Sequence, residues 1–143
     1  MSREQRLLDR IGGLRADRSP SRYAASAGED LEALMESIRQ HMVHLLNARH
    51  GMCETVPDYG LPALSDMIVG RGEHLRRVQD AIRTTIEKYE PRLRRVRVTH
   101  HAGEGDDQRL VFRIDAVMVG RSAEHRVWYE TSMAPTGELD VSG

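Results

Sequence analysis

The chain has 143 residues, of which 39% are hydrophobic and 30% are charged, so it is long enough and apolar enough to form one globular domain. Its formal net charge is -1, which argues against non-specific nucleic-acid binding as the main role, because no overall positive field would gather phosphates. Cys53 is the only cysteine, so an internal disulfide is excluded and a reducing compartment is expected. The charged N-terminus and the lack of a long apolar run predict a soluble cytoplasmic protein without direct membrane insertion.

The first expected element is a short helical turn that carries Leu7, Leu8 and Ile11 and ends at a glycine pair. A single turn is not stable alone in water, so we expect these three side chains to dock on the body of the protein or on a partner. A polar run over residues 15–28 predicts a flexible linker. The sequence therefore predicts an N-terminal short helix and linker over residues 1–28 and a single domain over residues 29–143.

Two amphipathic helices are expected next, because apolar residues recur at intervals of three and four over residues 29–49 and 73–89. A loop over residues 51–62 separates them, followed by a short helix that begins at Pro62 and ends at Gly70. The apolar stripe of the first helix consists of Leu31, Leu34, Met35, Ile38, Met42, Leu45 and Leu46.

Beyond residue 90 the hydrophobic period changes from helical to two, which predicts strands. The expected strands lie around Val96 and Val98, over residues 110–118 and 126–133, and in a short segment at residues 139–141. Helices followed by a meander predict an α+β fold, with the N-terminal helices packed on one face of a small, mainly antiparallel β-sheet. The central strand is partly apolar on its other face and the edges are lightly guarded, so we expect neighbouring proteins to complete the sheet.

The transition from helix to strand contains a charged corner. Pro91 cannot continue a helix and biases Glu90 toward extended geometry, so the carboxylate and the guanidinium of Arg92 are held on a stiff turn. Such a corner suits docking, and we predict Glu90, Pro91, Arg92, Arg94 and Arg95 as partner-binding residues. A helix-ending proline with a local ion pair is the plain alternative. If the docking role holds, Glu90→Ala or Arg92→Ala abolishes assembly and leaves the fold largely intact, whereas a variant that fails to fold would show the motif to be structural.

Four segments together carry a resemblance to a known family. They are Leu7–Ile11, the helix end Leu45–Gly51, the turn Tyr59–Leu64, and Tyr89–Leu93. In this order they resemble the contractile-tail baseplate wedge family, often labelled lysozyme-like, over nearly the whole chain. Members of this family include phage tail sheath initiators and a baseplate subunit of the type VI secretion system. The N-terminal leucine-rich turn favours the secretion-system branch.

The resemblance implies a structural role in a baseplate wedge docked at the inner membrane. It implies the wedge subunits TssF and TssG as neighbours, and seeding of a contractile sheath made of TssB and TssC by strand pairing at the sheet edge. By the match, Glu90, Pro91 and Arg92 take the place of the family's Glu-Pro-Arg motif, which is implicated in assembly contacts. A phage-type contractile tail is the alternative setting.

The lysozyme-like label also raises a hydrolase alternative. A glycosidase needs two carboxyl groups, one of them with a raised pKa, whereas Arg92 beside Glu90 is expected to lower the pKa of that carboxyl group. We therefore predict no catalytic residue. His41 and His44 lie three residues apart, but no further ligands complete a metal set, so no metal or cofactor is expected. The arginine run after Pro91 lacks aromatic partners for nucleic acid.

Overall fold

The computed structural model describes residues 20–63, 71–102 and 109–143. The chain divides into two compact units, residues 1–33 and 34–143, and the contacts described below all lie within the second unit. Its elements are α2 (Pro20–Asn47), α3 (Arg71–Tyr89), β1 (Leu93–His101), β2 (Leu110–Val119), β3 (Glu124–Met133) and β4 (Leu139–Ser142). The predicted turn around residues 7–11 and most of the short helix expected after Pro62 lie outside the described residues.

The helix α2 begins at Pro20, nine positions before the predicted start at Glu29, and it therefore includes residues 20–28, which were expected to belong to the linker. Two local features explain the longer helix. Proline suits a first helical turn because the amide hydrogen that it lacks has no helical partner there. Alanine, which is frequent between residues 24 and 33, is the best helix former.

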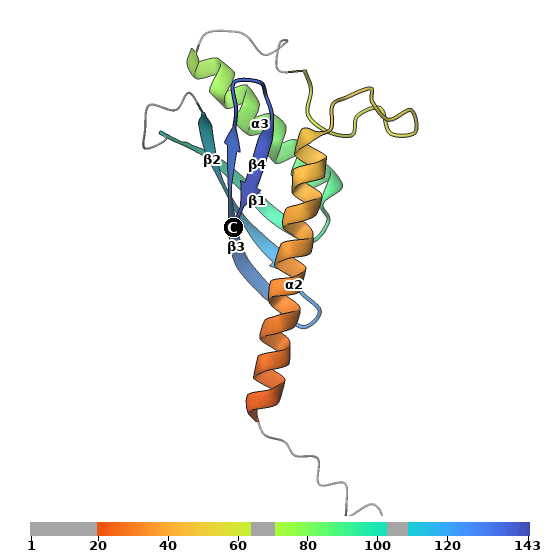
Figure 1. Cartoon of the computed structure of the whole chain (residues 1–143), viewed down its shortest axis with the longest axis vertical. Helices are drawn as coiled ribbons and strands as arrows, with labels where there is room; N and C mark the ends of the chain where they lie inside the picture. Colours follow the sequence, from red (N-terminus) through yellow and green to blue (C-terminus); the bar gives the residue numbers. More distant parts are fainter. Residues whose placement is uncertain (1–19, 64–70, 103–108) are drawn as a thin grey trace, which may run out of the picture. The chain divides into compact units, whose positions relative to one another are not determined.

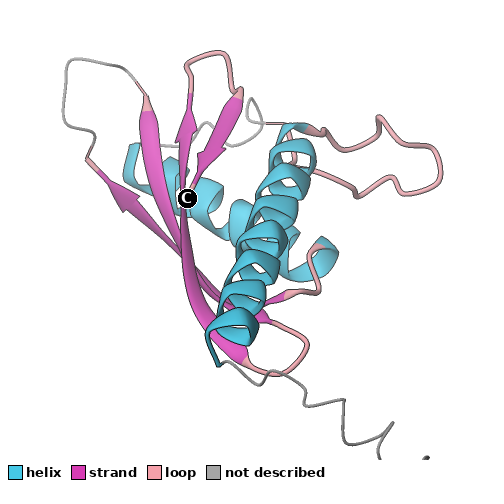
Figure 2. Cartoon of the chain, turned by 60° about the horizontal axis from the view of Figure 1, so that its bottom comes forward, coloured by secondary structure: helices cyan, strands magenta, loops and turns pink. Residues whose placement is uncertain are grey.

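The four strands form one sheet in the order β1-β2-β3-β4, and each neighbouring pair is antiparallel. Within the second unit, α3 and the part of α2 from Leu34 onward pack against this sheet (Figures 1 and 2). The predicted α+β fold is confirmed, as is the order of the two long helices and four strands. In such a meander β1 and β4 are the two edge strands.

The core lies between the helices and one face of the sheet. Alternate residues of β2 are buried, so this strand presents one face to the helices and the other outward. Burial of one such side chain contributes roughly 1.5–3 kcal/mol. The fully enclosed core side chains include Ile38, Met42 and Leu45 of α2, Ile82 and Ile86 of α3, and Phe112, Ile114 and Met118 of β2.

The outward face of the sheet carries charged side chains, half-buried valines and the large aromatic side chain of Trp128. Trp128 on β3 is 50% exposed, and the guanidinium of Arg113 on β2 lies 5.0 Å from the centre of its ring. Arg113 also donates a hydrogen bond of 3.1 Å to Asp115. Val117 and Val119 on the outward face of the central strand are only half-buried by the residues that the structure describes, as the prediction of an incompletely covered face requires.

β1 carries an irregularity that simple alternation does not predict. Its register with β2 shifts between Arg94 and Arg97, and Arg95 has a φ of 54°, in the left-handed region that is unfavourable for most residues with a side chain. The shift brings Leu93 and Val96, three positions apart, onto the same buried face. Consecutive arginines at 94 and 95 are both exposed in consequence.

Candidate protein-binding site at the Glu90–Arg92 corner

Main-chain hydrogen bonds fix the corner between α3 and β1 on both sides. The amide of Glu90 donates to the carbonyl of Ile86 at 2.8 Å, which is the last helical bond of α3. The amide of Leu93 donates to the carbonyl of Glu90 at 3.1 Å and closes a tight turn around Pro91. The amide of Val119 donates to the carbonyl of Arg92 at 2.9 Å and ties the corner to β2. The corner is therefore as stiff as the sequence predicts.

The carboxylate of Glu90 is completely buried and paired with Arg92 in a bidentate geometry. Its side chain is 0% exposed, and Nε and Nη2 of Arg92 each lie 2.7 Å from one of its two oxygens. The main-chain amide of Arg92 donates to the same carboxylate at 3.2 Å. Charge-assisted bidentate pairs of this kind are the strong ones, and they fix orientation as well as charge. The local ion pair, which was the plain alternative to a docking role, is present, and it is internal.

A histidine of α2 completes the pairing of this carboxylate. His41 Nδ1 donates to Glu90 Oε2 at 2.7 Å, and the hydroxyl of Tyr59 lies 3.5 Å from His41 Nε2. The ring of Tyr59 in turn meets the ring of Tyr89 edge to face, with centroids 5.1 Å apart. Sequence reasoning treated His41 only as a metal candidate. The available signal was its place on the flank of the apolar stripe, four positions before Leu45.

The surroundings of Glu90 hold the pKa of its carboxyl group below the ordinary value. Burial raises this pKa, but the hydrogen bonds from Arg92 and His41 favour the charged form and outweigh burial. The carboxylate is therefore ionised at neutral pH, the opposite of what a general acid requires. Across the described ranges no group of three or more histidine, cysteine or acidic side chains is arranged to hold a metal ion.

Arg92 connects the buried carboxylate with the surface. Its Nη1 donates to Ser37 Oγ of α2 at 3.0 Å, and its side chain is 33% exposed. A guanidinium has five N–H donors, and the side-chain bonds to Glu90 and Ser37 use three of them, which leaves two for a partner. Glu90 itself has no exposed surface, so it takes part in docking only by holding Arg92 in place.

The buried hydroxyl of Tyr129 lies in the same region. It donates to the carbonyl of Met35 in α2 at 3.1 Å, and its side chain belongs to the core. Burial raises the pKa of Tyr129 to about 12, and the negative charge of Glu90 adds to this effect. The phenol therefore stays protonated and acts as a donor that fastens β3 to α2 beside the corner.

The other residues predicted at this site lie on the surface. Pro91 and Arg95 are exposed, and Arg94 is 66% exposed with a long contact of 3.9 Å to Glu124. The corner therefore presents a proline and three guanidinium groups, one of them oriented by Glu90. Leu7, Leu8 and Ile11, which are also predicted to bind a partner, lie outside the described residues.

The helix end after Leu45 and the turn at Tyr59 are in direct contact, although the sequence separates them. The amide of Leu61 donates to the carbonyl of Ala48 at 3.0 Å, and the amide of His50 donates to the carbonyl of Leu61 at 3.2 Å. Gly60 has a φ of 97°, and a Cβ there would collide with the carbonyl of Ala48. Glycine is the residue that tolerates both the positive φ and the close approach of the Ala48 carbonyl. This turn positions Tyr59 next to His41. The segments Leu45–Gly51 and Tyr59–Leu64, which both carry the resemblance, are therefore in direct contact.

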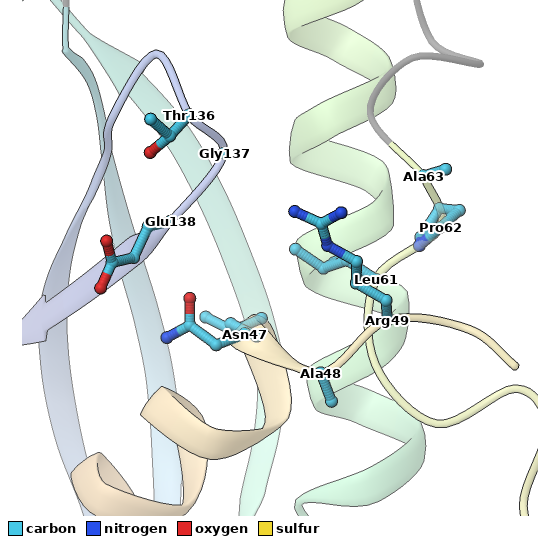
Figure 3. A pocket seen from close by; sticks show the side chains of 10 residues that line it. Asn47, Ala48, Arg49, Leu61, Pro62, Ala63, Thr136, Gly137 and Glu138 are labelled. Atoms are coloured by element: carbon cyan, nitrogen blue, oxygen red, sulfur yellow. The ribbon is translucent and has the colours of Figure 1, made fainter. Parts of the chain in front are cut away.

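A hollow of about 560 Å³ lies at the C-terminal end of α2. Figure 3 shows it between Asn47 and Arg49 on one side, Leu61 and Pro62 on another, and Thr136 to Glu138 of the β3–β4 turn. Its lining contains one arginine and one carboxylate, both on exposed residues. The described lining residues therefore supply one carboxyl group, whereas a glycosidase uses two.

The chain has an α+β fold, and at this corner the fully buried carboxylate of Glu90 pairs with Arg92, which is partly exposed. The chain belongs to the family of baseplate wedge protein gp25, because the model of that family matches residues 32–123. The family match makes the chain a structural component of a baseplate. The resemblance on which the sequence reasoning rested is confirmed at this level.

The chain is also similar to a chain of one solved structure, "The baseplate complex from the type VI secretion system". The alignment has a TM-score of 0.55 and 24% sequence identity, and it covers 73% of this chain and 97% of the other chain. At this identity the likeness concerns the fold. No curated protein matches the chain. Within the described residues no helix is long and apolar enough to cross a membrane.

Proposed function

We propose that this chain is the wedge subunit of a type VI secretion baseplate, with a role like that of TssE. In this role it docks with TssF and TssG and seeds the sheath made of TssB and TssC by strand pairing, at a baseplate held at the inner membrane. The observation that carries the proposal is the structural match, which spans 97% of a chain from a complex of this kind. The family match alone fits a phage-type contractile tail equally well.

The corner supports a docking role because part of it is rigid and still has free donors. Arg92 is held by three side-chain hydrogen bonds and keeps two N–H groups for a partner. A partner therefore meets a guanidinium whose orientation is already fixed, which lowers the entropic cost of binding. Carboxylates and main-chain carbonyls are the groups that such a fork recognises best.

Arg95 gives a second reason to assign a contact role to this corner. Its φ of 54° costs on the order of 1 kcal/mol for a residue with a side chain. Glycine would relieve this cost, yet an exposed arginine stands there. A strained residue on the surface, next to a rigid ion pair, is consistent with a side chain that is kept for contact with a partner.

A capture experiment with surface variants tests the proposal. The tagged protein is presented to TssF, TssG, TssB and TssC, as wild type and as Arg95→Gly and Arg94→Glu. These variants change the exposed charges of the corner and leave the buried Glu90 intact. Arg83→Glu, an exposed arginine on α3, is the matched control. We expect both corner variants to weaken capture of TssF and TssG while the control does not.

Folding of each variant is checked by circular dichroism and by its urea unfolding midpoint. If the wild type captures none of the four subunits, the proposed function is wrong and a cell-wall hydrolysis assay is the next measurement. If the wild type captures TssF and TssG and the corner variants do so equally well, the baseplate role stands and the corner is not its contact.

A further inference from the structure

The outward face of the sheet presents a large aromatic side chain that stays half in water. Trp128 of β3 is 50% exposed, whereas its neighbours Val127 and Tyr129 point into the core and are buried. The guanidinium of Arg113 lies over the Trp128 ring, and a hydrogen bond of 3.1 Å to Asp115 holds this guanidinium in place. The ring is therefore oriented without any partner. Tryptophan and arginine are the side chains that most often carry the binding energy of protein interfaces.

Two charged side chains flank Trp128 on the same strand. Arg126 and Glu130 lie two positions to either side of it, so the alternation of a strand puts all three side chains on the outward face. Both charged residues are exposed, and neither forms an ion pair with any residue that the structure describes. The outward face of β3 therefore carries a positive, an aromatic and a negative group in chain order.

This order of groups is complementary to itself when it is reversed. A second β3 that runs antiparallel across the face, with the two Trp128 rings at the crossing point, places Arg126 of each copy opposite Glu130 of the other. The two charged contacts are equivalent, as a two-fold axis requires. A copy that ran parallel would instead bring like charges together, which is unfavourable. The charges of β3 therefore fit a second copy of this chain in one orientation.

The neighbouring strand β2 has the same symmetry about the same point. Asp115 is the register partner of Trp128, so a two-fold axis that crosses the strands at Trp128 also passes Asp115. Val111 and Val119 lie four positions to either side of Asp115, and the described residues leave both only half-buried. The axis brings Val111 of one copy opposite Val119 of the other, which removes apolar surface from water. Asp115 itself remains paired with Arg113 of its own chain.

We propose that the outward face of the sheet binds a second copy of this chain, face against face, in a symmetric dimer centred on Trp128. Two twisted sheets that pack in this way keep their strands within about 30° of antiparallel, and their outer strands diverge. Arg97, which lies in the same row as Asp115 and Trp128 but on the outer strand β1, therefore stays at the rim. The inference goes beyond the proposed function, because it concerns the free chain.

Charge swaps in the full-length chain test the two-fold symmetry, with sedimentation equilibrium as the measurement. Arg126→Glu and Glu130→Arg each turn both charged contacts of the dimer repulsive, so each should weaken self-association about tenfold or more. The double variant carries the two charges in reversed order, which is again complementary to itself, and its dissociation constant should return to within about threefold of the wild type. Arg76→Glu, at an exposed position of α3, is the matched control and should change it by less than about twofold.

Fluorescence gives an independent measurement at the centre of the proposed interface. Trp128 is the single tryptophan of the chain, so tryptophan emission reports on this face alone. As the concentration of the wild type rises and the dimer forms, the half-exposed ring should leave water and its emission should shift to shorter wavelength. Trp128→Ala should weaken self-association about tenfold or more, because central aromatic side chains dominate such interfaces. Circular dichroism and the urea midpoint check the folding of each variant.

Each outcome decides for or against the second copy. Loss of the dimer in both single swaps and its return in the double swap supports the inference, because a different partner would not restore its contacts to reversed charges. A wild type that stays monomeric up to its solubility limit overturns it. A dimer that the single swaps leave unchanged, or that the double swap fails to restore, overturns it as well. None of these results depends on capture of TssF or TssG, so a failure of the proposed function leaves this test intact.

Discussion

Two sets of ion pairs in this chain use the same residue types with different consequences. On α3, Arg83 lies 3.5 Å from Asp80 and 3.9 Å from Glu87, and all three side chains are well exposed. At the corner, Arg92 pairs with Glu90, which is fully buried. Water competes for the first set and is excluded from the second. Because of this difference, breaking the corner is expected to cost far more free energy than breaking the pairs on α3.

The largest effect is expected for Glu90→Ala. Removing this carboxylate leaves Arg92 and His41 without their partner and opens a void inside the fold, so the free energy of unfolding should fall by about 3–5 kcal/mol. Urea unfolding followed by circular dichroism measures it. The sequence-based expectation is that Glu90→Ala leaves the fold largely intact, whereas the complete burial of this side chain leads us to expect a loss of stability.

Glu87→Ala is the matched control, since Glu87 is also a glutamate of the same region but is exposed on α3. It should change the free energy of unfolding by less than about 0.5 kcal/mol. Equal effects of the two substitutions would show that burial does not distinguish the two sets of ion pairs.

The pH dependence of stability sharpens the comparison. The pKa of Glu90 is lowered in the folded protein, so its stabilising effect is present above the unfolded pKa, about 4.3, and is lost as pH falls through the folded value. His41, Arg92 and Tyr129 face the same carboxylate. The stability difference between wild type and Glu90→Gln should therefore be largest near neutral pH and shrink below pH about 4. Urea midpoints across this range measure it, and a difference that grows on acidification would contradict the lowered pKa.

A smaller effect is expected for Tyr129→Phe. The substitution removes one neutral hydrogen bond, from the buried hydroxyl to the carbonyl of Met35, and keeps the ring in the core. The free energy of unfolding should fall by about 1 kcal/mol. This value lies between those for the corner and for the pairs on α3, because the bond is buried but carries no charge. A loss as large as that of Glu90→Ala would mean that the ring itself moves.

The sequence predicts best what is set by local spacing. The hydrophobic period located both long helices and all four strands, and Pro91 marked the corner because its effect on the chain is local. The pairing of Glu90 with His41 joins residues 49 positions apart, and no local pattern encodes it. The left-handed residue at Arg95 was equally hidden, since arginine shows no preference for that conformation.

The outer edge of β4 was misjudged for the same reason, because its contacts come from residues that are distant in the sequence. Apolar alternation at residues 139–141 identified β4 correctly but gave no sign that Asn47 and Arg39 would occupy its outer side. Side chains of a helix that cover a strand edge depend on the packing of distant segments. The sequence read this edge as lightly guarded, whereas the structure closes it with hydrogen bonds.

The smallest effect is expected for Arg83→Ala, which removes both ion pairs of the α3 set at once. Exposed pairs at these helical spacings contribute up to about 0.5 kcal/mol each, and alanine regains a little helix propensity, so the net loss should stay below about 1 kcal/mol. High salt should reduce this loss further, because solvent screens exposed charges. A loss above about 1 kcal/mol in low-salt urea unfolding would contradict the comparison, since exposed and buried pairs would then carry similar free energy.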